Sequence, residues 1–296
     1  MKKFTVGAND AGQRLDKFLG KLLKDAPMGM IYKWIRKKRV KVNGKKQEIS
    51  YMLNVGDCLE LYINDEFFGE EAVSVKKSLP IEVVYEDENI LVADKPSGIA
   101  VHGEDGCLLE RLHWYLSGKG EYNPAEENTF APAFCNRIDK NTSGLVIAAK
   151  NAAALRQMNQ KLKDRQVDKY YIMAVEGSLT PAEGVIRGYT VKDEKTRKVT
   201  FSKEKMPGGK EAETYYRTLP DGFVEAKLIT GRTHQIRASF AYLGHPLVGD
   251  VKYGAKKNGK KDFQMLRAYK IEFNFTTPAG ELDYLSGKVI KTDKNL

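Results

Sequence analysis

The residues from Cys135 to Gly144 form the densest polar stretch between two apolar segments of the chain. In an extended strand Arg137 and Asp139 would point the same way, because side chains alternate along a strand. An aspartate at the mouth of a sheet, followed by Thr, Ser and Gly, can act as a nucleophile or as a general base. It can equally be a turn aspartate that bonds its own backbone, and the residues alone favour that turn.

A second polar stretch runs from Gly231 to Arg237 and places Arg232, His234 and Arg237 at the expected start of a helix. Positive side chains and the free N–H groups of a helix start suit an anionic ligand. The arginines could instead hold a carboxylate of the protein itself, and that carboxylate could be Asp139. Both interpretations remain open at the level of the residues.

The histidines and cysteines follow no pattern typical of a metal site. The four histidines form no HxH or HExxH pair, and the three cysteines lie far apart with no CxxC. This argues against a metal centre and against a disulfide framework, so a reducing cytoplasm is the simplest location. No GxGxxG or Walker motif occurs, which leaves dinucleotide and nucleoside triphosphate chemistry without support.

The composition sets outer limits on the fold. The chain has 296 residues, of which 42% are hydrophobic and 30% charged, so it can bury a core and is not globally disordered. No stretch of 18 apolar residues occurs, and the start of the chain lacks an apolar signal segment. We therefore expect one large domain or two unequal ones, with no membrane association.

The positive charge is unevenly distributed. Residues 1–65 hold fourteen Lys and Arg against seven Asp and Glu, which is +7 of the total net charge of +10. Such an asymmetry indicates a separate basic module with an anionic partner, most often nucleic acid. The alternative is a basic protein that is merely soluble.

The basic module has a readable pattern. Apolar residues recur at helical spacing in 11–25 and again in 30–39, Asn43-Gly44 is a type I′ turn signal, and a strand is expected at 58–63. The dense cluster of lysines and arginines between residues 33 and 41 favours an RNA clamp over a solvated helix face. The expected RNA-binding residues are Lys33, Arg36, Lys37 and Lys41.

Residues 66–79 have mixed charge and little periodicity, and we interpret them as a linker between domains at 1–65 and 80–296. From residue 80 short strand patterns dominate. Two helices are expected, one capped by Asn151 and one that stops at Gly244. Many strands without regular alternation with helices predict an α+β domain around a mixed, mostly antiparallel sheet.

Four motifs of the second domain resemble those of the RluA-type pseudouridine synthases, in the same order. NRIDKNTSGLVIAAKN resembles the signature that carries the catalytic aspartate, and ILVADKPSGIAVH resembles the first motif. KYYIMAVEG and GRTHQIRASFAYLGHPLVGDVKYG resemble the later ones. The basic module resembles the small RNA-binding domain of ribosomal small-subunit protein four.

The resemblance implies an isomerase that detaches uracil from ribose in RNA and rejoins it through carbon, acting on ribosomal RNA of the large subunit, as a monomer without cofactor or metal. It implies Asp139 as the essential acid, Tyr171 as the ring that packs on the target base, Arg232 as the partner of the aspartate, and Arg137 as an RNA contact. Whether the aspartate attacks the sugar, attacks the base or removes a sugar proton stays open.

The sequence departs from the family pattern next to these residues, with Asn136 where the family usually has His and Ile138 where it has Leu. Two other classes of function remain. One is an RNA-binding protein without catalysis on the same scaffold. The other is a glycoside hydrolase with two carboxylates, which ranks last because no second carboxylate stands in a comparable motif.

Overall fold

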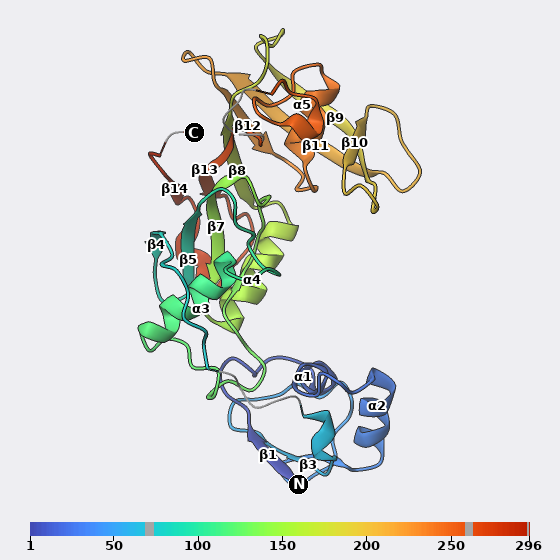
Figure 1. The fold of residues 1–296 in the computed structure, drawn as a ribbon. Helices are drawn as coiled ribbons and strands as arrows, with labels where there is room; N and C mark the ends of the chain where they lie inside the picture. Colours follow the sequence, from blue (N-terminus) through green and yellow to red (C-terminus); the bar gives the residue numbers. More distant parts are fainter. Residues whose placement is uncertain (69–73, 258–262, 295) are drawn as a thin grey trace.

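The computed structural model describes residues 1–68, 74–257, 263–294 and 296. The chain forms a small N-terminal module, residues 1–68, and a larger C-terminal module that begins at residue 74 (Figure 1). Among the described residues no helix is long and apolar enough to cross a membrane.

The N-terminal module packs two helices on a small antiparallel sheet in the order β1-β3-β2. Its elements are β1 (Lys2–Thr5), α1 (Leu15–Leu22), α2 (Met28–Arg36), β2 (Val40–Val42), β3 (Cys58–Leu61) and the 3-10 turn η1 (Asp65–Phe67). Asn43 and Gly44 both have positive φ, 54° and 73°, as the type I′ turn requires. The predicted helices, turn and strand are therefore confirmed.

The expected linker begins too early. Phe67 packs edge-on against Trp34 and Phe68 stacks on Phe4, so both extend the core of the N-terminal module. Residues 69–73 of the expected linker lie outside the described residues.

The C-terminal module is built on one sheet of eleven strands, whose main path runs β10-β9-β11-β12-β8-β13-β7-β5-β4. All pairs are antiparallel except β13 with β7, which confirms the predicted mixed, mostly antiparallel sheet. The strands are β4 (Val83–Glu86), β5 (Ile90–Lys95), β6 (Ala133–Phe134), β7 (Ser143–Ala149), β8 (Val167–Met173), β9 (Glu183–Lys192), β10 (Val199–Ser202), β11 (Lys210–Thr218), β12 (Val224–Leu228), β13 (Leu266–Phe273) and β14 (Val289–Lys291).

The two faces of this sheet bury different helices, so the central strand β7 is apolar on both sides. Its Val146 lies in the core that contains α3 and α5, whereas Ile147 lies in the core that contains α4 and η3. The helices are α3 (Leu108–Gly118), α4 (Ala152–Lys163) and α5 (Gln235–Tyr242), with the 3-10 turns η2 (Val251–Tyr253) and η3 (Gly280–Leu285). Sequence analysis predicted α4 and α5 but missed α3.

Gly144 has a steric reason to be glycine. It sits in β7 with φ 113°, and a Cβ there would lie 2.0 Å from the carbonyl oxygen of Ala268 in β13. No other residue allows this approach of the two parallel strands. The glycine therefore fixes where the polar loop before β7 meets the sheet.

The two modules touch through polar side chains. Asp10, which is 1% exposed, accepts hydrogen bonds from Asn128 (2.7 Å) and Thr129 (2.8 Å) of the C-terminal module. The first turn of α4 also contributes, because the Ala152 N–H donates to the side chain of Asn9 (3.0 Å). The N-terminal module is thus docked on the start of α4 and is not only tethered by the chain.

Candidate active site

A cleft of about 1120 Å³ opens on the C-terminal module at the ends of its central strands. It is lined by the loop 135–142 before β7, the β8 residues around Tyr171, the last turn of α4 and the loop 229–234 before α5. Both polar stretches singled out in the sequence therefore border one cleft.

Asp139 stands in a turn, but its carboxylate does not bond its own backbone. Its carbonyl oxygen accepts from the Thr142 N–H (3.0 Å), while its side chain, which is 24% exposed, accepts from Arg237 (3.1 Å). The turn favoured by the residues alone is present, and it presents the carboxylate to the cleft.

The ammonium group of Lys95 holds this loop in place through hydrogen bonds to backbone carbonyl oxygens. Lys95 is fully buried at the end of β5 and donates to the carbonyl oxygens of Pro96 (2.9 Å), Ile99 (2.8 Å) and Lys140 (2.8 Å). Burial lowers the pKa of Lys95 to about 8, although the carboxylates of Asp139 and Asp94 act to raise it. The hydrogen bonds of Lys95 hold the residue after Asp139 against the loop that follows β5.

Arg237 of α5 bridges two carboxylates. Its Nη1 donates to Asp139, while Nε and Nη2 form a two-point contact with the buried Asp250 at 2.7 and 2.8 Å. The guanidinium also lies over the Tyr253 ring, 4.9 Å from its centroid. Asp250 and Tyr253 hold the guanidinium group in place, so its Nη1–H is directed at Asp139. The positive charge of Arg237 then stabilises the Asp139 carboxylate.

The resemblance implied that Arg232 would pair with Asp139, and the structure corrects this. Arg232 lies before the first turn of α5 and is exposed at the rim of the cleft, where its Nε donates to the carbonyl oxygen of Glu211 (2.9 Å). The helix then carries Arg237, and not Arg232, to the aspartate.

His234 completes the contacts around Asp139. It caps α5 in a left-handed conformation (φ 48°), with Nε2 3.7 Å from the Asp139 carboxylate and Nδ1 2.8 Å from the Tyr253 hydroxyl. Burial lowers the pKa of His234, while the charge of Asp139 opposes that shift. The imidazole is therefore neutral at pH 7 and adds no second positive charge.

Tyr171 in β8 lies under the cleft, and its neighbour Tyr170 points to the other side of the sheet. Tyr171 is 5% exposed, and its burial together with the charge of Asp139 raises the pKa of its hydroxyl above the usual range. Tyr170 instead donates to Glu272 (2.9 Å) and receives the Lys270 ammonium on its ring. The strand alternation thus selects Tyr171 as the ring that faces the cleft.

The loop residues beside Asp139 divide between the cleft and the fold. Arg137 is exposed and lines the cleft. Asn136, which replaces the usual family histidine, accepts a hydrogen bond from the Ile147 N–H (2.8 Å) and so holds the loop to β7. Asn136 therefore fixes the loop and also lines the cleft.

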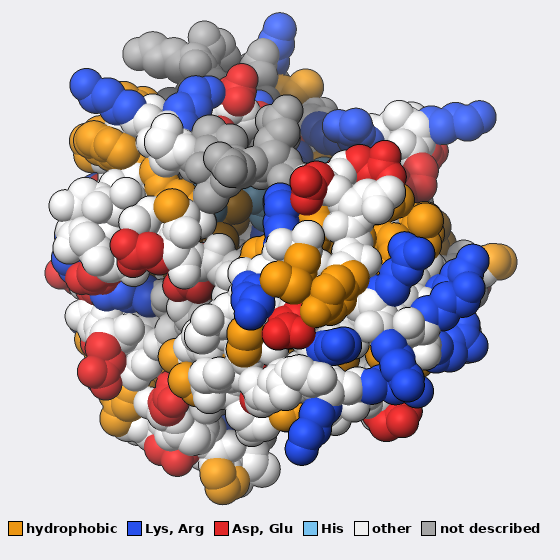
Figure 2. Space-filling view, turned by 90° about the horizontal axis from the view of Figure 1, so that it is seen from below, with side chains coloured by type: hydrophobic (Ala, Val, Ile, Leu, Met, Phe, Trp, Pro, Cys, Tyr) orange, Lys and Arg blue, Asp and Glu red, His pale blue; other side chains and the backbone are white. Residues whose placement is uncertain are grey.

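The expected RNA-binding residues of the N-terminal module do not reach the cleft. Lys33, Arg36 and Lys37 are exposed at the end of α2, and the Lys41 ammonium lies 5.3 Å from the Tyr62 ring centroid. Figure 2 views the molecule from this end, and Lys and Arg side chains gather at the right of the view, the side on which α2 lies in Figure 1.

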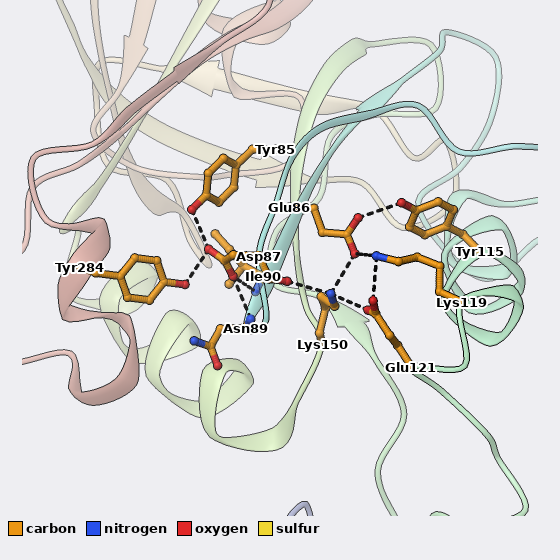
Figure 3. Close-up of polar contacts among 10 residues, drawn as sticks. All are labelled: Tyr85, Glu86, Asp87, Asn89, Ile90, Tyr115, Lys119, Glu121, Lys150 and Tyr284. Carbon is orange, nitrogen blue, oxygen red and sulfur yellow. Dashed lines mark hydrogen bonds and ion pairs between the residues drawn. The ribbon is translucent and has the colours of Figure 1, made fainter.

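Another group of charged side chains, outside the cleft, is balanced. Glu86 and Glu121 pair with Lys119 and Lys150 at 2.5–2.8 Å, around the turn between β4 and β5 (Figure 3). The Tyr115 hydroxyl also donates to Glu86 (2.8 Å). These four ion pairs join α3 and the residue after β7 to the sheet, and each of the two lysines has an acidic partner.

No group of three or more His, Cys, Asp and Glu in the described part of the chain could hold a metal ion. The arrangement in the cleft is one carboxylate, oriented by an arginine and bordered by an aromatic ring and an exposed arginine. It suits nucleophilic or base chemistry on a flat, uncharged ring in an anionic polymer.

Comparison with known proteins agrees with this geometry. The family model for RNA pseudouridylate synthase matches residues 89–242, and that for the S4 domain matches residues 13–58. An "Uncharacterized RNA pseudouridine synthase" of Mycoplasma capricolum subsp. capricolum is 34% identical over 98% of this chain and 97% of its own length. "Ribosomal large subunit pseudouridine synthase C" of Vibrio vulnificus is 34% identical over 92% of this chain and 87% of its own.

Solved structures show the same fold. "Human RNA Pseudouridylate Synthase Domain Containing 1" superposes with a TM-score of 0.54 at 24% identity, covering 72% of this chain and 91% of that chain. The family match spans the loop with Asp139, β8 with Tyr171 and α5 with Arg237, which are the elements that build the cleft. On this evidence the chain is a member of the RNA pseudouridylate synthase family that carries an S4 domain ahead of its catalytic module.

Proposed function

We propose that this protein isomerises uridines of large-subunit ribosomal RNA to pseudouridine, with Asp139 as the catalytic group. The observation that carries the proposal is the Asp139 carboxylate in the cleft, 3.1 Å from an arginine that Asp250 holds in place. A relative at 34% identity over 92% of the chain is named for the large ribosomal subunit, which supports the choice of RNA.

The reaction balances without a cofactor. The bond between uracil N1 and ribose C1′ breaks and a bond between C5 and C1′ forms, while C5 loses a proton and N1 gains one. A carboxylate can assist by attacking the sugar, attacking the base or removing a sugar proton, and in each case it must be ionised and close to the nucleotide.

The other residues of the cleft position the nucleotide. A uridine has to leave its stack to reach Asp139, and the Tyr171 ring provides an aromatic surface for the extruded base. Arg137, exposed beside the carboxylate, is placed to contact the RNA around the vacated position. Arg237 and Lys95 act through Asp139 and its loop, as positioning residues.

The test is release of tritium from ribosomal RNA labelled at uracil C5. Asp139→Asn keeps the size of the side chain but removes its charge, so turnover should fall below about 1% of wild type while RNA binding persists, because losing an essential group costs several orders of magnitude. Asp293→Asn, at an exposed aspartate near the end of the chain, is the matched control and should retain full activity.

Residual turnover of Asp139→Asn above that level would contradict the proposed role. RNA binding by wild type with no tritium release from any ribosomal RNA would instead favour an RNA-binding protein without catalysis. Mapping pseudouridines in the large-subunit RNA of a strain that lacks the gene identifies the target positions.

A further inference from the structure

Helix α4 connects the two places where this protein is expected to meet RNA. Its first residue, Ala152, bonds Asn9 of the N-terminal module, and a Cβ on Gly12 of that module would lie 3.6 Å from the Arg156 guanidinium. Its last turn lines the cleft through Asn159, Leu162 and Lys163. In Figure 1 the helix lies between the N-terminal module and the upper part of the sheet.

The exposed face of this helix is basic. Arg156, Asn159 and Lys163 follow the spacing i, i+3, i+7 and are all exposed, so they share one face, and the exposed Arg165 follows directly after the helix. We call these four residues the α4 stripe. Its three cations have no ion-pair or hydrogen-bond partner among the described residues.

The neighbouring acids offset only part of the charge of the α4 stripe, because hydrogen bonds from the neutral Gln160 leave Asp164 negative and this one acid stands beside three cations. The Asp164 carboxylate accepts two hydrogen bonds from Gln160, and Asp168 pairs with Lys227 at 2.7 Å. The positive charge of the stripe is therefore available to a ligand that arrives from solvent.

The backbone at Arg165 supports a functional reason for its side chain. It has φ 57°, the left-handed conformation in which a helix usually ends on glycine, and an arginine there costs about 1 kcal/mol. Arg165 lines the cleft, as does Arg197, which has φ 51°. Side chains kept at unfavourable backbone positions around one cleft point to a shared ligand.

We infer that the α4 stripe binds the phosphates of the RNA strand that runs from the uridine in the cleft toward the N-terminal module. A helix of twelve residues spans about 18 Å, which corresponds to roughly five stacked nucleotides at 3.4 Å each. The inference rests on the proposed function only in that the ligand is RNA. Beyond that function, the inference names the surface that binds the flanking strand and the length of strand that this surface contacts.

Binding of the full chain to oligouridylates of about 2 nucleotides, too short to reach Arg156 from the cleft, and about 20 nucleotides across a salt series tests this, independently of turnover. Arg156→Ala should leave the short RNA unaffected and make the slope of log affinity against log salt shallower by about 0.8 for the long RNA. Lys163→Ala, beside the cleft, should lower the slope for both lengths. Lys291→Ala, at an exposed lysine on β14 that does not line the cleft, is the matched control and should change neither slope.

On ribosomal RNA the Arg156→Ala and Lys163→Ala variants should raise KM and leave kcat unchanged. Equal slopes for wild type and Arg156→Ala on the long RNA would overturn the inference, as would a wild type that binds both lengths equally well. If wild type released no tritium from ribosomal RNA but the salt slopes changed as expected, the proposed function would be wrong. The inference that the α4 stripe binds RNA would still hold.

Discussion

Positive side chains are held in opposite ways in the two modules. In the N-terminal module Lys33, Arg36 and Lys37 are exposed and have no partner among the described residues. In the cleft Arg237 is buried, and each of its three terminal contacts goes to a carboxylate. Exposed lysines and arginines can bind phosphates in many orientations, whereas a buried, fully paired arginine sets the position of one group.

We therefore expect the exposed cations to contribute to the affinity for RNA and Arg237 to contribute to the reaction. The distribution of net charge along the sequence locates the exposed cations, because fourteen lysines and arginines fall in the first 65 residues. It does not identify a buried, paired arginine such as Arg237. Removing Arg237 should therefore lower kcat, whereas removing the exposed cations should weaken RNA binding.

Among the variants that test this comparison, the largest effect is expected from Arg237→Met. Asp139 would lose its ion-pair partner and its fixed position, and a misplacement of about 1 Å costs roughly 100-fold in rate, so kcat should fall by about that factor. Arg232→Met is the matched control and should lose less than tenfold, because the Arg232 side chain donates to the Glu211 carbonyl oxygen and not to Asp139. Steady-state tritium release measures both, and an equal loss in the two variants would contradict the assignment of Arg237.

A smaller effect, on binding alone, is expected when the basic residues of the N-terminal module are removed together. If each contacts one phosphate, the variant should bind ribosomal RNA with a salt slope shallower by about 3, at 0.7–0.9 per contact, and keep its kcat at saturating RNA. The variant carries alanine at Lys33, Arg36, Lys37 and Lys41, and the control carries alanine at the exposed Lys203, Lys205, Lys210 and Lys291. Equal slopes for variant and control would show that the basic face is only solvated.

The smallest effect concerns the balanced cluster around Glu86, whose charges should serve folding only. Burial would raise the pKa of Glu86, but Lys119, Lys150 and Tyr115 outweigh it and lower the pKa to about 2. Because the folded pKa lies below the unfolded value of 4.5, Glu86 stabilises the fold above pH 4.5, and the contribution is lost as the pH falls toward 2.

Urea unfolding of wild type and Glu86→Gln between pH 7 and pH 3 measures this contribution. Wild type should be more stable at pH 7, and the difference should shrink below pH 4.5. The effect is modest because these side chains are partly solvated. A difference that stays constant with pH would contradict the ion-pair origin, and any change in RNA binding would contradict the separation of this cluster from function.

Local patterns were enough to predict most of the fold. The Asn151 cap and the helix stop at Gly244 depend on interactions within a few residues, and both are confirmed. Helix α3 was missed although Leu108, Leu112 and Leu116 follow one helical face. Polar and glycine-rich residues surround that helix, and its stability comes from packing on the distant sheet.

The two polar stretches that border the cleft were singled out in the sequence, but Lys95 and the pairing of Asp139 were not. The residues left open that an arginine of the second polar stretch holds Asp139, and the resemblance pointed to Arg232. Which arginine reaches the aspartate depends on where α5 begins and how it is rotated, and the two partners are 98 residues apart in the chain. The sequence around Arg237 does not determine where α5 begins or how the helix is rotated toward Asp139.

The docking of the modules through Asp10 also decides how their affinities combine. Two binding surfaces joined by a loose tether share an effective concentration that the tether dilutes, whereas two surfaces in fixed register avoid that dilution when the RNA spans both. Asp10 is buried between the modules, with partners on the C-terminal side at 2.7 and 2.8 Å, and its carboxylate lies within the protein interface. If one RNA spans both modules, Asp10 would raise the avidity for that RNA without contacting it, because it keeps the two binding surfaces in fixed register.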